Sequence, residues 1–331
     1  MKRLGTKHLD FLTDDFGIWQ HTEGEEIDQT QGYALDDAAR ALLTAIEVTR
    51  PDLAEIYITF IERAICHEPV INFYSAERQP WERPWSPDAL AECYWALAVA
   101  ISNSVQESRC RRIIETSIAP RIYELREWLR TAAYLTLGAA LIDQPLALEL
   151  ADQLLEMYRS NAHPDWPWPE DTLYYANAIL PYALLEVGRL HGHVEAAQTG
   201  ERMLRFLNTI CLQEREVRLI GNEGWYARGG TPAKFGEQPI EAAYSVLANV
   251  SAYHVTKNDD WLAAASRYLN WFWGENSSGE ALIDLESQSV ADGIDAPPRG
   301  VSPNRGAENI ICYLYAQEQL WPLLVLQDKS N

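Results

Sequence analysis

Several signals of common enzyme classes are missing from this sequence. It contains no GxSxG, P-loop or GxGxxG motif, so it gives no support for a serine hydrolase, a kinase or a dinucleotide-dependent dehydrogenase. The seven histidines show no helical HxxxH spacing and no repeated carboxylate spacing. We therefore predict no metal site and no cofactor.

Cysteines are few and widely spaced. The five residues form no CxxC or Cys/His cluster and mostly lie in apolar segments with helical spacing, which indicates reduced core thiols. No early apolar run resembles a signal peptide. A cytoplasmic location is the expectation that follows.

Basic residues are scarce beside acidic ones. Acids outnumber Lys and Arg by 48 to 27, which gives a formal net charge of −21. Such a field repels phosphate backbones and anionic lipids, so we expect neither nucleic acid nor membrane as a partner. The apolar fraction of 47% is enough for a sizeable core. We predict one domain over residues 1–331, because single domains built from many similar units reach this length.

Helical periodicity dominates, and its type alternates along the chain. One segment is apolar nearly all round and the next carries charges on one face, which is typical of inner and outer helices. The inner type is predicted at 37–48, 88–101, 126–141, 171–187, 240–255 and 306–320. The outer type is predicted at 52–65, 105–118, 145–159, 194–208 and 259–273.

The sixth inner segment lacks an outer partner after it. Residues 6–15, with Leu9, Phe11 and Leu12 among charges, can take that place. Repeats of this length indicate a solenoid or a closed toroid. We predict an all-α (α/α)6 toroid in which the N-terminal helix closes the ring, although an open α-solenoid fits the periodicity nearly as well.

The long connections all run from an outer helix into the next inner helix. They are predicted at 16–35, 66–87, 160–170, 209–239 and 274–305. Because the opposite turns are short, we expect these loops to crowd one rim and build a pocket there. A short hairpin is also predicted within 209–239, beginning with Glu216–Ile220.

Aromatic rings and acids share these loops, and this combination suits neutral sugars. Each ring is equally consistent with ordinary loop packing, so the inference depends on the cluster. The candidate substrate-binding rings are Trp81, Trp85, Trp166, Trp168, Tyr174, Trp225 and Tyr226. The polar candidates are Asp36, Asn177, Glu237, Gln238, Arg305 and Glu308. For any one of the acids, an ion pair with Arg40 or Arg305 is an equally good explanation.

Three acids are candidate catalytic residues. Glu170 follows an aromatic, proline-rich loop and precedes an apolar segment, so it is the best proton donor. Asp37 and Glu241 are the best bases. Acids in a first helical turn also cap backbone N–H groups, and Asp36 and Asp88 fit that role.

Five stretches resemble a bacterial group of predicted glycosidases that are often associated with glycosyltransferases. The similar stretches are 12–21, 32–42, 168–178, 235–242 and 304–309. The group belongs with the six-hairpin, (α/α)6-barrel glycosidases. The resemblance therefore implies this barrel, an oligosaccharide or glycoside substrate, and a glycosyltransferase as a partner.

Two motifs depart from the pattern of that group. Asp36–Arg40 has Ala38 where the group has Asn, and Glu237–Glu241 begins and ends with Glu where the group has Gln and Asp. The identity of the sugar therefore stays open.

Three functions remain in competition. The first is a glycoside hydrolase, inverting as related barrels commonly are, that uses a neutral acid and a charged carboxylate. The second is a sugar epimerase or isomerase, which in similar barrels uses histidine. The third is a domain that binds glycan, or accompanies a glycosyltransferase, without catalysis.

Overall fold

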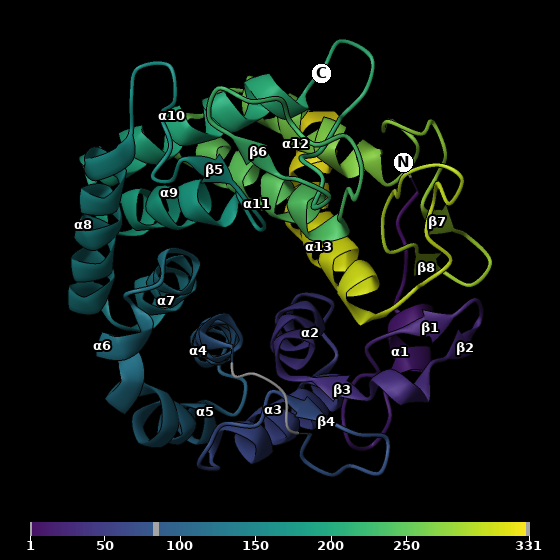
Figure 1. Ribbon diagram of the computed structural model, residues 1–331. Coiled ribbons are helices and arrows are strands. Elements are labelled where there is room, and N and C mark those ends of the chain that lie inside the picture. The colour runs from purple at the N-terminus through teal and green to yellow at the C-terminus, as the bar shows by residue number, and fades with distance from the viewer. Residues whose placement is uncertain (1, 82–85, 329–331) are drawn as a thin grey trace.

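The computed structural model describes residues 2–81 and 86–328, and its helices form two concentric rings (Figure 1). The inner helices are α2 (Leu35–Glu47), α4 (Pro87–Ser102), α7 (Leu129–Ile142), α9 (Ile179–His191), α11 (Pro239–Thr256) and α13 (Ala307–Asp328). Each inner helix contacts the next, and α13 returns to α2. The predicted all-α (α/α)6 toroid is confirmed, and its ring is closed.

The outer ring follows the predicted alternation. Its helices are α3 (Pro51–Ile65), α5 (Glu107–Ile113), α8 (Gln144–Asn161), α10 (Val194–Cys211) and α12 (Asp260–Trp271). The outer helix predicted over 105–118 is broken, since α5 passes through a π turn at Ile114–Ile118 and a 3₁₀ turn at Ala119–Arg121 into α6 (Ile122–Leu125). Pro120 explains part of this break, because it has no N–H to donate to a regular helix.

The N-terminal segment closes the ring as predicted, although its helix is shorter than expected. Helix α1 (Lys7–Leu12) contacts α13, and Leu9 and Leu12 are fully buried. Before it, the backbone of Leu4 donates to and accepts from the Gln317 side chain at 2.8 and 3.1 Å. The helix ends at Leu12 because Thr13 turns into extended backbone.

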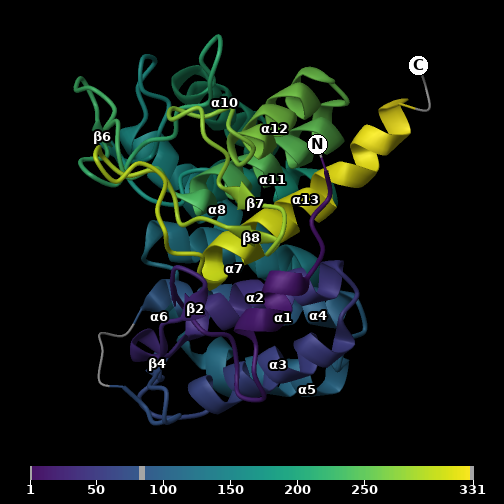
Figure 2. The same ribbon diagram turned by 90° about the vertical axis from the view of Figure 1, so that its right-hand side faces the viewer.

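Long loops gather at one end of the barrel, the loop end (Figure 2). They contain a 3₁₀ turn at Gln29–Gln31 and four short antiparallel pairs, which are β1 (Thr22–Glu23) with β2 (Glu26–Ile27), β3 (Tyr33–Ala34) with β4 (Phe73–Tyr74), β5 (Thr172–Leu173) with β6 (Tyr226–Ala227), and β7 (Ile283–Asp284) with β8 (Ser289–Val290). The hairpin predicted from Glu216 is wrong. Val217 bridges Leu212 and Asn276 instead.

Aromatic side chains fill the barrel axis below the loop end. Trp95 lies at the centre, and the rings of four tyrosines lie 6.0 to 6.4 Å from it, measured between centroids. These are Tyr134, Tyr182, Tyr244 and Tyr315, each from a different inner helix. The axis is therefore packed, and a pocket at the loop end has a floor.

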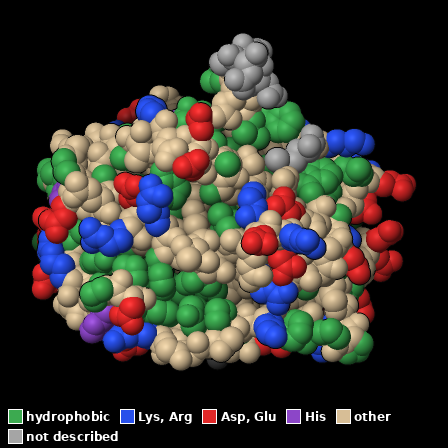
Figure 3. Space-filling view, turned by 90° about the horizontal axis from the view of Figure 1, so that it is seen from above, with side chains coloured by type: hydrophobic (Ala, Val, Ile, Leu, Met, Phe, Trp, Pro, Cys, Tyr) green, Lys and Arg blue, Asp and Glu red, His purple; other side chains and the backbone are tan. Residues whose placement is uncertain are grey.

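The surface mixes charges of both signs. In the view from above, acidic and basic side chains are interspersed around a hydrophobic area (Figure 3). Within residues 2–81 and 86–328, no helix is both long and apolar enough to cross a membrane. Of the free cysteines, Cys66 alone is exposed and the other four are buried, largely as expected for core thiols.

Candidate active site at the loop end of the barrel

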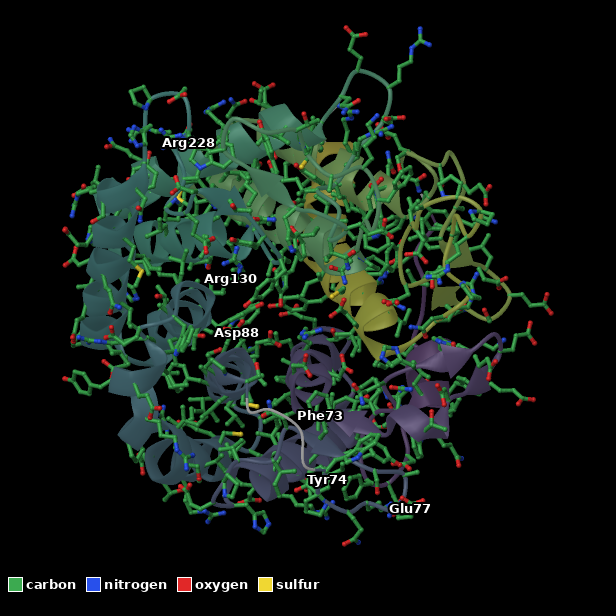
Figure 4. All side chains as sticks on the ribbon, in the orientation of Figure 1. Phe73, Tyr74, Glu77, Asp88, Arg130 and Arg228 are labelled. Carbon is green, nitrogen blue, oxygen red and sulfur yellow. The ribbon has the colours of Figure 1, made fainter. Side chains whose placement is uncertain are left out.

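A cavity of about 900 Å³ opens where α4 and α7 begin, and we call it the mouth pocket. Its lining comprises Phe73, Ser86, Pro87, Asp88, Trp128, Leu129, Arg130, Glu170, Tyr174 and Tyr175. Asp88 and Arg130 lie toward the centre of the ring in Figure 4, whereas Arg228 lies near its edge. Aromatic rings thus share one cavity with two acids and a guanidinium.

Asp88 is a site residue, although its sequence position predicts a helix cap. Ser86 is the N-cap of α4 instead, since its hydroxyl accepts from the N–H of Ala89 at 3.4 Å. Asp88 is therefore free to accept from the Tyr175 hydroxyl at 2.7 Å and from the Thr131 hydroxyl. The Ser-Pro pair at the helix start was the available signal, because Ser at the N-cap with Pro at the next position is a common helix start.

Glu170 is paired with Arg130, a residue that sequence reasoning missed. Two guanidinium nitrogens lie 3.1 and 3.0 Å from the two carboxylate oxygens. The same guanidinium lies 4.6 Å from the centre of the Tyr175 ring. The expectation that Glu170 opens a helix is wrong, because β5 follows it and α9 begins only at Ile179. An ion-paired carboxylate in this geometry accepts hydrogen bonds and does not resemble a desolvated proton donor.

Glu241 lies in the first turn of α11 and is almost completely buried. One carboxylate oxygen accepts from the backbone and side-chain N–H groups of Asn177 at 3.2 and 3.1 Å. The other oxygen has no partner among the described residues. Burial raises the pKa of Glu241 to about 7, against the lowering effect of Asn177 and of nearby Arg130.

A second group of acids surrounds Arg40, and we call it the Arg40 cluster. The guanidinium lies 2.6 Å from Asp36, 3.6 Å from Asp37, 2.8 Å from Glu92 and 2.6 Å from Glu308. One positive charge cannot balance four carboxylates. Burial raises the pKa of Glu92 to about 8, and burial together with the charge of Asp36 raises the pKa of Asp37. With a pKa of about 8, Glu92 retains its proton at neutral pH.

Glu92 was not among the predicted site residues. It is the only acid in the apolar stretch from Ala89 to Ile101 of α4, and this isolation was the signal for a buried functional or paired carboxylate.

Two predicted sugar platforms are buried. Trp166 is 3% exposed and Trp168 is 0% exposed. Trp166 packs edge-on against Phe206 and Tyr226, both at 5.1 Å, and its indole N–H donates to the backbone of Glu170 at 2.7 Å. Because both tryptophans are buried in the packing beneath the loop, neither presents a ring face to a ligand.

The exposed rings at the pocket are tyrosines. Tyr174 is 40% exposed and Tyr175, which was not predicted, is 45% exposed. Trp225 packs edge-on against Tyr174 at 6.3 Å. Trp81 is partly buried, and its backbone N–H donates to the backbone carbonyl of Phe73 at 2.9 Å. Because Phe73 lines the mouth pocket, Trp81 lies beside the pocket wall. Trp85 lies outside the described residues.

Two polar candidates lie away from the mouth pocket, and a third occupies the N-cap position of a helix without a capping hydrogen bond from its side chain. Glu237 is buried and holds neighbouring loops, since it accepts from the Trp271 indole at 2.8 Å and from the backbone of Leu219 at 3.0 Å. Gln238 occupies the N-cap position of α11. Arg305 donates to the Leu282 carbonyl and the Ser289 hydroxyl in a separate cavity. The expectation that Arg305 pairs the acids is wrong, and Arg40 does so.

The fold is shared with solved structures of sugar-acting proteins. A cellobiose 2-epimerase from Bacillus thermoamylovorans is 11% identical, with 97% of this chain and 96% of that chain covered and a TM-score of 0.72. A sugar epimerase from a ruminal bacterium is 13% identical, with coverages of 95% and 96% and a TM-score of 0.68. An α-mannanase from Bacteroides thetaiotaomicron is 9% identical, with coverages of 97% and 96% and a TM-score of 0.61.

The chain has the fold of the six-hairpin (α/α)6-barrel glycosidases. The motif resemblance had implied this fold. No protein-family model and no curated protein matches the sequence. Identities of 9% to 13% carry the fold alone, so the activity has to be argued from the residues of the site.

Proposed function

We propose that this chain is a carbohydrate-active enzyme, specifically a glycoside hydrolase that binds its substrate in the mouth pocket. The observation that carries the proposal is one cavity of about 900 Å³ that combines exposed tyrosine rings with Asp88, Arg130 and Glu170. Aromatic faces bind the apolar faces of sugars, while charged groups bind their hydroxyls. The neighbours with this fold are named as epimerases and glycosidases, which supports a sugar as the substrate.

Hydrolysis of a glycoside needs a neutral acid and a charged carboxylate. Glu241 suits the acid role, because its pKa is about 7 and its unpartnered oxygen can carry the proton. It is buried against Asn177 and is not among the residues that line the mouth pocket, so the proposed step requires the segment 174–177 to move before the proton reaches the glycosidic oxygen. Asp88 suits the base role, because two hydroxyls donate to it and no cation neutralises it within the described contacts. In the proposed step, Glu241 gives its proton to the glycosidic oxygen as the bond from C1 to that oxygen breaks. Water attacks C1, and Asp88 accepts the proton that the water loses.

The remaining catalytic candidates take supporting roles in this proposal. Glu170 holds Arg130 at the pocket wall through the ion pair. Asp37 lies in the Arg40 cluster, 3.6 Å from the guanidinium, where burial and the charge of Asp36 raise its pKa. Asp36 and Glu308 belong to the same cluster.

An epimerase is the competing enzyme, and its base would have to stand beside the sugar carbon. None of the described residues that line the mouth pocket is a histidine. His254, on the inner helix α11, lies in another cavity with Glu186 and Arg189. The described lining of the mouth pocket offers carboxylates and no histidine, and we propose hydrolysis on that ground.

The test is a screen of oligosaccharides in D₂O followed by proton NMR. Hydrolysis creates a new reducing end, whereas epimerisation keeps the chain length and places deuterium on the sugar carbon. With a substrate in hand, Asp88→Asn and Glu241→Gln should each lower kcat by roughly 2–4 orders of magnitude. Asp171→Asn is the matched control, because Asp171 neighbours Glu170 but its side chain is 81% exposed.

An aryl glycoside with a good leaving group separates the two roles. It needs little protonation, so Glu241→Gln should harm its hydrolysis much less than Asp88→Asn does. If both variants keep full activity, or if deuterium enters the product without chain cleavage, the hydrolase proposal fails.

A further inference from the structure

A second cavity lies on the outer side of the turn that leads into α13. We call it the Arg305 pocket. Its volume is about 300 Å³, near the lower end for small-molecule sites, and it shares no lining residue with the mouth pocket. Its walls come from α1, the β1–β2 turn, the β7–β8 turn and Arg305. The proposed hydrolysis makes no use of it.

An aromatic face is fixed at this pocket. Phe11 is 45% exposed, and its ring stacks on His8 with 5.4 Å between centroids and 26° between planes. His8 Nε2 lies 2.7 Å from the carbonyl oxygen of Arg305. A carbonyl can only accept, so Nε2 carries the hydrogen and Nδ1 is left as an acceptor. Because burial lowers the pKa of His8, the imidazole is neutral at pH 7.

The polar groups of the pocket offer donors and acceptors together. Arg305 is held by its bonds to the Leu282 carbonyl at 3.2 Å and the Ser289 hydroxyl at 3.0 Å. Lys7 is held by the Glu286 carbonyl at 2.7 Å. The lining also contains three carboxylates, Glu25, Asp284 and Glu286, so its acids outnumber these two cations. An anionic ligand is therefore disfavoured, whereas sugar hydroxyls, which both donate and accept, match the mixture.

We infer that the Arg305 pocket is a second carbohydrate site, which holds a unit of a neutral glycan against the Phe11 ring. The inference rests on the proposed function, since this site would retain a glycan that is cut at the mouth pocket. Arg305 and the carboxylates then contact the hydroxyls of the stacked unit.

The test is affinity electrophoresis through gels that contain β-glucan, mannan or starch, with polygalacturonate as the anionic probe. One neutral polysaccharide should retard the wild-type protein. Phe11→Ala should weaken that retention by about three- to tenfold, which is the value of one aromatic contact. Its fold should persist, because the inward residues of α1, Leu9 and Leu12, are untouched. Phe11→Leu is a second variant that keeps apolar bulk and removes the ring.

Tyr123→Ala is the matched control, since Tyr123 is 72% exposed and lines neither cavity. Equal effects of Phe11→Ala and Tyr123→Ala, retention only by polygalacturonate, or no retention at all would overturn the inference. If retention depends on Phe11 and no glycan is hydrolysed, the second site stands and the proposed function fails. If Asp88→Asn abolishes hydrolysis while Phe11→Ala leaves retention unchanged, the proposed function stands and the second site fails.

Discussion

Two buried arginines at the loop end of the barrel have different surroundings. The side chains of Arg40 and Arg130 are 7% and 6% exposed. Arg40 contacts four carboxylates. Among the described carboxylates Arg130 pairs with Glu170 alone, and it also donates to the Tyr175 carbonyl and lies against two tyrosine rings. The two arginines are therefore equally buried, but they differ in the number of carboxylates that each one has to balance. The Arg40 cluster has surplus acid and retains a proton on Glu92, while the Arg130 pair is neutral and lines the cavity where an uncharged sugar would fit.

Removing Arg40 should have the largest effect on stability. Arg40→Met leaves buried carboxylates without their cation, and breaking a buried pair costs about 3–5 kcal/mol. Urea unfolding at pH 7 measures this loss. The loss should be smaller at pH 5, because protonated carboxyls no longer repel one another.

Arg50→Met is the control for this variant. Arg50 pairs with Asp10 and Asp52, whose side chains are 43% and 60% exposed, so its loss should cost only about 0–1 kcal/mol. If both variants lost the same free energy of unfolding, Arg40 would contribute no more to stability than an arginine in a surface ion pair.

Removing Arg130 should cost less, about 1–3 kcal/mol, because the side chain of Glu170 is 24% exposed and can be solvated from the cavity. Arg130→Met should nevertheless abolish measurable sugar binding, which calorimetry can follow. The double variant Arg130→Met/Glu170→Gln removes the stranded charge and should recover much of the lost stability. An unchanged stability in the double variant would mean that the Glu170 charge is not the cause.

The sequence predicted the ring well and the contacts across it poorly. Inner helices such as α4 and α11 are apolar all round, so local periodicity was enough to find them. The start of α9 was missed because Thr172 and Leu173 continue the apolar run, and their pairing with Tyr226 and Ala227 is not local. Glu92 and Arg130 were missed for the same reason, since their partners lie 52 and 40 residues away.

The pH dependence of stability should distinguish the two arginine centres further. The folded-state pKa of Glu92, about 8, lies above its ordinary value of 4.5. Between these values the folded protein holds a proton that the unfolded chain releases, so stability falls as pH rises from 4.5 to 8. One such group changes the free energy of unfolding by at most about 1.4 kcal/mol per pH unit. Glu241, with a pKa of about 7, contributes in the same direction.

Glu92→Gln stays neutral at every pH and keeps an acceptor for Arg40, so it should flatten this slope. Urea unfolding at pH 5, 6.5 and 8 gives the comparison with the wild type. Glu149→Gln removes a charge that is 51% exposed and should leave the slope unchanged. If the free energy of unfolding of Glu92→Gln varied with pH as steeply as that of the wild type, Glu92 would not be the residue that holds a proton in the folded state.

The smallest expected effect comes from the hydroxyl of Tyr175. Tyr175→Phe keeps the ring that lies against Arg130 and removes only the hydrogen bond to Asp88. Stability should change by about 1 kcal/mol or less, since Asp88 keeps its bond from Thr131 and can bind water in the cavity. Turnover should fall by roughly tenfold, because the carboxylate that accepts the proton from water is held by one donor where it had two. KM should change little, since the aromatic face for the sugar remains.

Tyr123→Phe, at an exposed tyrosine outside the mouth pocket, controls for loss of a hydroxyl. A rise in KM with kcat unchanged would instead assign the Tyr175 hydroxyl to sugar binding.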